Sequence, residues 1–146
     1  MSAPVSVILA RKGVGCETIE PDATIGDLAR RLSEFEIGAL VVSDDGETVA
    51  GIITERDLVH ALARAEAAAL SERVETVMSR PVTTCTPTTS TDEVMAIMTE
   101  RRVRHVPVVE GDRLVGIVSI GDVVKWRIDE LQEDTDRLQD YVRGSY

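Results

Sequence analysis

The chain has 146 residues, 43% of them hydrophobic and 29% charged, which is the balance of an ordinary globular protein with one compact core. Sixteen Lys and Arg against 26 Asp and Glu give a net charge of -10, which argues against DNA or RNA as the main partner. No apolar run approaches the ~20 residues that span a bilayer, and residues 1–11 do not resemble a signal peptide. We therefore expect a cytoplasmic protein without a membrane partner.

The first half of the chain predicts the order helix, strand, strand, helix. Thr24 with Asp27 marks the start of a helix, and apolar residues at helical spacing predict its buried face. Two β-branched runs, residues 39–43 and 49–53, predict adjacent strands joined by a turn at Asp45 and Gly46. A second helix is expected to begin at Thr54. The predicted core face of the first helix consists of Ile25, Leu28 and Leu32.

A connector follows at residues 61–73, where Ala, Glu, Arg and Leu predict a helix. The two cysteines, Cys16 and Cys85, have neither a CxxC spacing nor the density of a disulfide scaffold, so we expect reduced, structural thiols.

The second half repeats the first. Pro87 follows Pro21 by 66 positions, and the stretch 116–122 follows the similar stretch 51–57 by 65. Ser90 with Glu93 predicts a capping box before a helix, strands are expected at residues 106–109 and 114–118 around a Gly111-Asp112 turn, and a helix should begin at Ser119. The expected core face of the first of these helices comprises Val94, Ile97 and Met98.

The last helix is expected to continue to about Arg143. A narrow apolar stripe runs along it, and its acidic residues lie largely outside that stripe as a solvated face without the glycine turn of a calcium loop. Trp126 is either a partner contact or a cap on the core. The stripe consists of Val124, Ile128, Leu131, Leu138 and Val142.

Two stretches, residues 51–57 and 116–122, share the pattern Gly, two apolar residues, Thr or Ser, two variable residues and Asp. Together with residues 77–82 and 103–109, they make the sequence similar to the CBS-pair family of regulatory modules. The resemblance implies an α/β (α+β) fold of two tandem CBS motifs, packed face to face with pseudo-two-fold symmetry and followed by a long C-terminal helix. We divide the chain into motif 1 (1–62), connector (63–75), motif 2 (76–128) and tail (129–146), and expect a homodimer.

The resemblance implies that Thr54 and Asp57, and likewise Ser119 and Asp122, contact a nucleotide between the motifs. A carboxylate accepts two hydrogen bonds and so suits the vicinal hydroxyls of a ribose. Helix N-terminal N–H groups suit sugar or phosphate oxygens. Local chemistry alone explains both pairs as helix N-caps without a ligand, whereas the duplication and the resemblance favour the ligand role for Asp57 and Asp122, and the two roles can coexist.

The basic run 101–105 is expected to supply the phosphate contacts, with Arg104 and His105 pointing inward. Arg101 and Arg102 either join them or only cap the helix dipole. Gly38 and Ala39 stand at the equivalent positions of the first half. We therefore predict a stronger site at Thr54 and Asp57, which borrows Arg104 and His105, and a weaker or vacant site at Ser119 and Asp122.

Apolar residues near these motifs are candidate walls for an adenine ring, although ordinary core packing explains each of them as well. Arg56 completes the predicted ligand-binding set. The wall candidates are Ile52, Ile117 and the strand 82–85, including Thr83 and Cys85. Pro107 also belongs to the predicted ligand-binding set, although it could simply shape the end of a strand.

The leading hypothesis is a stand-alone sensor that binds AMP, ADP, ATP, NAD or S-adenosylmethionine and acts on an unidentified effector protein in trans. The alternative is an oligomeric adaptor with vestigial clefts. We expect no enzyme activity and no catalytic cofactor, because His60 and His105 belong to no nucleophile elbow, HExxH or phosphate-loop motif.

Overall fold

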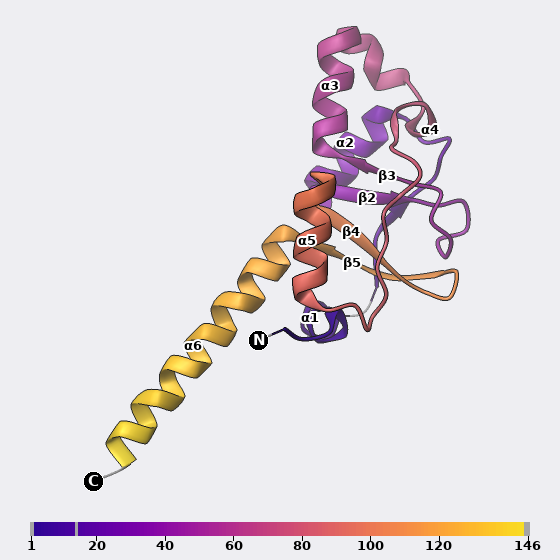
Figure 1. Cartoon of the computed structure of the whole chain (residues 1–146). Coiled ribbons are helices and arrows are strands. Elements are labelled where there is room, and N and C mark those ends of the chain that lie inside the picture. The colour runs from indigo at the N-terminus through magenta and orange to yellow at the C-terminus, as the bar shows by residue number, and fades with distance from the viewer. Residues whose placement is uncertain (1, 14, 145–146) are drawn as a thin grey trace.

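A computed structural model describes residues 2–13 and 15–144 and shows two similar halves followed by one long helix (Figure 1). The predicted α/β class, with small sheets and a long C-terminal helix, is confirmed. The first half contains β1 (Thr18–Ile19), α2 (Ile25–Phe35), β2 (Ala39–Val42), β3 (Gly51–Thr54) and α3 (Glu55–Ala65). The second half contains α5 (Thr91–Arg101), β4 (His105–Glu110), β5 (Arg113–Ser119) and α6 (Ile120–Gly144), and the remaining elements are α1 (Val5–Lys12), η1 (Glu66–Ser71) and α4 (Val74–Val77).

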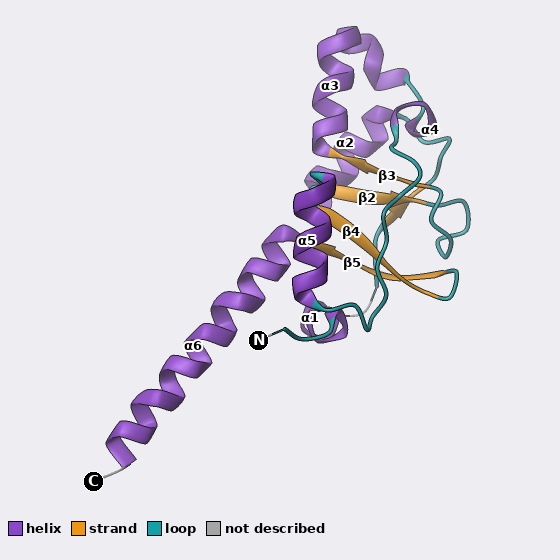
Figure 2. Cartoon of the chain, viewed as in Figure 1, coloured by secondary structure: helices purple, strands orange, loops and turns teal. Residues whose placement is uncertain are grey.

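The strands form one small sheet in each half, and both sheets cross the middle of the body with α3 above and α1 below (Figure 2). In the first sheet, β1 is parallel and β3 antiparallel to the central β2. In the second, β4 and β5 are antiparallel, and Cys85 pairs with Val108 where the first half has β1. Equivalent residues have equivalent partners, as in Ala39 with Thr54 and His105 with Ser119. This correspondence is the pseudo-two-fold symmetry expected from the repeat.

Each half has its own hydrophobic core, so the expectation of one compact core is wrong, and the predicted helix faces supply much of both. Trp126 is only 7% exposed and belongs to the second core. Of the two roles considered for it, a partner contact or a cap on the core, the structure supports the cap. The first core consists of Ile19, Ile25, Leu28, Leu32, Leu40, Val42, Ile53 and Val74. The second consists of Val5, Ile8, Cys85, Val94, Met98, Val106, Val108, Val118, Val123 and Trp126, with Ile97 packed against it.

The short helix α1 is an element that the sequence analysis missed, and it packs on the second half although it precedes the first. Val5 and Ile8 are buried in the second core, and the Val5 N–H donates to the Thr89 carbonyl at 2.8 Å. Conversely, α4 precedes the second half and places Val74 in the first core. The two halves thus exchange their leading helices. The available signal for α1 was the helical spacing of Val5, Ile8 and Leu9, but its N-cap is Pro4, which provides no side-chain cap.

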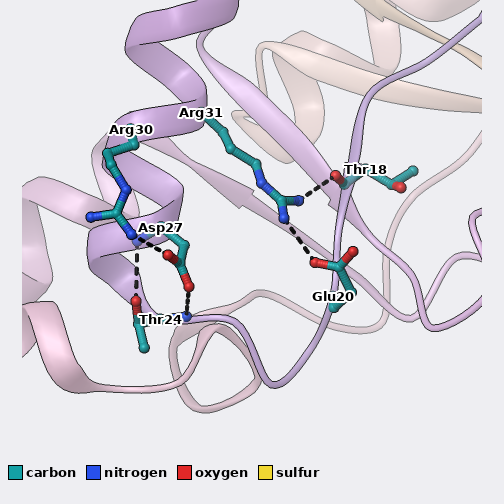
Figure 3. A network of polar contacts seen from close by, with 6 residues as sticks. All are labelled: Thr18, Glu20, Thr24, Asp27, Arg30 and Arg31. Atoms are coloured by element: carbon teal, nitrogen blue, oxygen red, sulfur yellow. Dashed lines mark hydrogen bonds and ion pairs between the residues drawn. The ribbon is translucent and has the colours of Figure 1, made fainter.

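The capping box is found at the opposite helix from the one predicted. At α2, the Thr24 N–H donates to Asp27 Oδ2 at 3.0 Å and the Asp27 N–H donates to Thr24 Oγ1 at 3.1 Å (Figure 3). At α5, Ser90 Oγ accepts from the Glu93 N–H at 3.1 Å, which is one half of a box. Among the described residues, the Glu93 carboxylate does not return a bond to the Ser90 N–H, whereas the Asp27 carboxylate does so at Thr24.

Arg31 fastens α2 to the strand before it. Its guanidinium donates to the Thr18 carbonyl at 2.9 Å and to the Glu20 carboxylate at 3.0 Å, while Arg30 pairs with Asp27 one turn away (Figure 3).

The connector and the tail differ in part from expectation. Residues 61–73 are not one helix: α3 ends at Ala65, Glu66 has a positive φ of 52°, and the chain continues as the 3-10 helix η1. The tail helix agrees with the prediction and ends at Gly144. Its side chains from 131 to 144 are exposed, and it projects away from the body (Figure 1).

The placement of α1 predicts that its inner face stabilises the second half. Ile8→Ala, at a side chain that is 3% exposed, is expected to lower the free energy of unfolding by about 2–5 kcal/mol. Val7→Ala on the same helix, at 36% exposure, should change it by less than about 0.5 kcal/mol. Urea unfolding followed by circular dichroism measures both, and equal small effects would show that α1 is not part of the core.

Candidate functional site

A cavity of about 230 Å³ lies between the two halves. Its walls come from the start of α3 and the edge of β3 on one side and from the turn between α5 and β4 on the other. Six residues predicted for the ligand site surround it: Ile52, Thr54, Arg56, Asp57, Arg104 and His105. The other lining residues are Gly38, Glu55, Ser79, Arg102 and Val103.

Thr54 and Asp57 form the N-terminal cap of α3. Asp57 Oδ2 accepts from the Thr54 N–H at 2.8 Å and from the Thr54 hydroxyl at 3.2 Å. The second carboxylate oxygen, Oδ1, has no hydrogen-bond partner within residues 2–13 and 15–144. The capping interpretation is therefore correct, and it leaves one oxygen of the carboxylate for another donor.

The basic side chains reach the cavity from the turn after α5. Arg102 ends that helix in the left-handed conformation, with φ 55°, and the Arg104 carbonyl accepts from the Ile120 N–H at 2.9 Å. His105 then begins β4 opposite Ser119. The turn is thus held at both ends, which places Arg102, Arg104 and His105 together on the wall of the cavity.

Gly38 lies where the two halves meet. A Cβ atom at position 38 would lie 3.4 Å from Glu55 Oε1 and 3.4 Å from His105 Nε2, so an alanine would be in van der Waals contact with both groups and a longer side chain would extend toward them. From the sequence, Gly38 marks a position of the first half that lacks the cation found in the second half. In the structure it also borders the imidazole of His105, which belongs to the second half.

Glu55 is a site residue that sequence reasoning missed. It follows Thr54 directly, its N–H donates to the Gly38 carbonyl at 2.9 Å, and its carboxylate lies beside His105. Burial lowers the pKa of His105 below its usual value, as do Lys12 and Arg104, while Glu55 and Asp122 act in the opposite direction. The imidazole is therefore mostly neutral at pH 7.

Ser119 and Asp122 cap α6 in the same way, but they do not line this cavity. The Ser119 N–H donates to Asp122 Oδ2 at 2.9 Å, and Lys12 Nζ donates to the same oxygen at 2.8 Å. Burial alone would raise the pKa of Asp122, but the hydrogen bonds from Lys12 and Ser119 outweigh it and hold that pKa below its usual value. Asp122 borders a second pocket of about 190 Å³, lined also by Ile8, Arg11, Lys12, Lys125, Trp126 and Asp129.

The remaining wall candidates lie elsewhere. Cys85 and Pro107 are buried, and the Cys85 N–H donates to the Pro107 carbonyl at 3.0 Å, so both have the core role that the sequence left open. Burial raises the pKa of the Cys85 thiol to about 11, and the same cause raises that of Cys16 to about 11, so both thiols are protonated and unreactive at neutral pH. Thr83 and Ile117 are half-buried and lie outside the first cavity.

Within residues 2–13 and 15–144, no group of three His, Cys, Asp or Glu side chains is placed to hold a metal ion. No helix in the same residues combines the length and the apolar character that crossing a bilayer requires.

Comparison with known proteins gives a consistent result. The family model for the CBS domain matches residues 9–64 and again 74–129. The mitochondrial CBS domain-containing protein CBSX3 of Arabidopsis thaliana is 35% identical over an alignment of 156 positions that covers 99% of this chain and 74% of the plant protein.

Solved structures agree with the sequence matches. The crystal structure of a CBS-domain containing protein of Agrobacterium tumefaciens has 49% identity and a TM-score of 0.82, covering 86% of this chain and 99% of that chain. The CBS domain pair of protein MJ0100, solved in complex with 5'-methylthioadenosine and S-adenosylmethionine, has 27% identity and a TM-score of 0.79, covering 89% and 99% of the two chains.

The half-buried imidazole of His105 predicts a pH-dependent stability. Because the pKa of His105 is lowered by folding, the unfolded chain binds more protons between that lowered pKa and about 6.5, so stability falls as the pH decreases through this window. Urea unfolding at pH 7.5 and at lower pH should therefore show that the free energy of unfolding decreases less on acidification for His105→Gln than for the wild type. His60→Gln, at an exposed site, is the control and should keep the wild-type slope.

Proposed function

The chain belongs to the CBS-domain family, and we propose that it is a regulatory module that binds an adenine nucleotide between its two motifs and acts on a separate effector protein. The observation that carries this proposal is the cavity that joins Thr54 and Asp57 of the first motif to Arg104 and His105 of the second. A carboxylate and a group of cations on opposite walls match the two polar ends of a nucleotide, its ribose and its phosphate.

The ribose end is assigned to Asp57. Its Oδ2 is occupied by the helix cap and its Oδ1 is left to accept from a ligand hydroxyl. Because the cap fixes the carboxylate before any ligand arrives, binding costs little side-chain ordering. Ile52, on the adjacent strand edge, contributes an apolar wall for the base, and its backbone N–H and carbonyl are already bonded to Ser79.

The phosphate end is assigned to Arg104 and Arg102, with His105 beside them. A cation ~4 Å from a phosphate gains on the order of 4 kcal/mol at the effective dielectric of a protein surface. Glu55 opposes this attraction from the other wall. An arriving phosphate would favour the protonated form of His105, so binding is expected to take up protons near neutral pH.

The ligand class is proposed from the relative that was solved with two adenosine derivatives. AMP is the first choice for this chain because the cations on the wall suit a phosphate group, while ADP, ATP, NAD and S-adenosylmethionine are the other members of the class. No step of catalysis is proposed, and a cytoplasmic location stays a prediction, since the similar plant protein is described as mitochondrial.

The regulatory signal would arise from the position of the cavity. Its walls belong to different motifs, so a ligand that touches both has different affinities for states in which the motifs are differently oriented. Such a difference in affinity is what a ligand needs to shift a conformational equilibrium.

A second copy of the chain is the proposed partner of the tail. The apolar stripe on α6 remains exposed, with Leu131 at 53% and Leu138 at 66%, which is unusual for large apolar side chains at regular helical spacing. Helices with such a stripe pair along it, and acidic and basic side chains flank it. An oligomeric adaptor with unoccupied clefts would share this feature and is the alternative function.

The first test separates the phosphate end from the ribose end. Arg104→Gln is expected to weaken AMP binding about 10- to 100-fold, the loss of one charge-assisted hydrogen bond, and to leave adenosine binding nearly unchanged. Isothermal titration of the nucleotide-stripped protein with AMP and with adenosine measures both affinities.

Arg101→Gln, in the same basic run but on the exposed end of α5, is the matched control and should bind AMP as the wild type does. Asp57→Asn retains an oxygen for the cap and should weaken AMP and adenosine equally. Wild-type protein that folds but binds none of the adenosine derivatives would favour the adaptor.

The second test concerns the tail. Replacing both Leu131 and Leu138 by Lys is expected to convert a dimer into a monomer, because four charges per dimer would enter the paired stripe. Gln132→Lys with Gln139→Lys adds the same charge beside the stripe and should preserve the dimer. Sedimentation velocity reports the assembly state, and a dimer that persists in the leucine variant would exclude the tail as the main interface.

A further inference from the structure

The second cleft is the pocket bordered by Asp122, the residue of the second motif that corresponds to Asp57. In this cleft the ammonium group of Lys12 is bonded to that carboxylate. Lys12 Nζ donates to Asp122 Oδ2 at 2.8 Å and to the Ile117 carbonyl at 2.8 Å. We infer that Lys12 closes the second cleft to nucleotide, so that each chain binds one ligand and not two. This inference rests on the proposed function, because it concerns the equivalent of the Asp57 site.

The two motifs show what Lys12 replaces. In the first motif the carbonyl of Ile52 accepts from the backbone N–H of Ser79 at 2.9 Å. In the second, the equivalent carbonyl of Ile117 accepts from the side chain of Lys12, and the same ammonium also reaches Asp122. The first motif therefore keeps its carboxylate available for a ligand, whereas the second neutralises its carboxylate internally.

The ammonium group is held in place by a packed helix. Val5 and Ile8 anchor α1 in the second core, and Leu9 packs on Gly116, where an added Cβ would lie 2.7 Å from Leu9 Cδ2. Arg11 adds an ion pair to Asp129 at 3.6 Å. Lys12 is thus positioned by the fold, which distinguishes it from a mobile surface lysine with an incidental partner.

The position of Lys12 disfavours a ribose there. Lys12 Nζ and the Ser119 N–H both donate to Asp122 Oδ2, and the ammonium charge weakens the whole carboxylate as an acceptor for the neutral hydroxyl of a ribose at Oδ1. The pocket that Asp122 borders is lined from α1 and α6 alone, so among its lining residues none comes from the strands and helices of the first half to form an opposite wall. Both features make the second cleft a weaker nucleotide-binding site than the first.

The experiment is a titration of AMP into full-length Lys12→Met, which retains most of the side-chain length without the charge. Calorimetry is expected to give one site per chain for the wild type and two for Lys12→Met, and Lys12→Met with Asp122→Asn should return to one. Arg11→Met is the matched control, because it breaks the neighbouring ion pair on the same helix and should keep one site.

A second measurement locates the sites without relying on stoichiometry. With methyl-labelled isoleucine, AMP should shift the Ile52 resonance in both proteins and the Ile117 resonance only in Lys12→Met. Two sites in the wild type, or one site in a folded Lys12→Met, would overturn the inference while leaving the proposed function intact. Binding by Lys12→Met alone, with the Ile117 shift, would support the role of Lys12 but refute the first cleft, and no binding by either protein would refute both.

Discussion

The exchange of leading helices between the two halves is the constraint on which the rest of the structure depends. Val5 and Ile8 of α1 complete the second core, and Val74 of α4 completes the first. A half of about 60 residues buries too little apolar surface to be very stable alone, so each half depends on a helix that the other end of the chain must deliver. The halves cannot separate fully without opening both cores, so any change in their relative orientation must keep α1 and α4 packed, and the cavity stays between the two motifs.

Within this frame, the duplication repeats the backbone but not the chemistry. Thr54 with Asp57 and Ser119 with Asp122 cap their helices by the same bonds, and the strand pairs beside them have the same register. What differs is what arrives from elsewhere in the chain: Arg104 and His105 face the first cap, and Lys12 sits on the second. The N-cap alone therefore does not determine the role of its carboxylate. The residues that approach the cap determine whether the carboxylate is open to a ligand or neutralised by a cation of the chain.

The sequence predicted the parts of this arrangement that repeat or that depend on neighbouring residues. The helix faces, the strand pairs and the two caps follow from local periodicity and capping chemistry, and the family resemblance brought Arg104 to Asp57. It did not reveal α1, whose only signal is a short apolar spacing, nor Glu55 and Lys12, whose roles depend on contacts distant in sequence. Cys85 shows the converse, because an apolar residue near a motif has the same sequence signature as a ligand wall and as a core position, and only its burial distinguishes them.

The charge of the chain illustrates how local geometry outweighs composition. A net charge of -10 would repel a phosphate, yet charges beyond the ~8 Å Debye length are largely screened at physiological salt. What a bound anion would experience is the set that lines the cavity, in which Arg56, Arg102 and Arg104 outnumber Asp57 and Glu55. Glu55 sits against the neutral His105, so the balance is close, and a single proton on that imidazole changes it by a full unit charge. In the proposed nucleotide site, the charge that faces an anion would therefore depend more on the protonation of His105 than on the net charge of the whole chain.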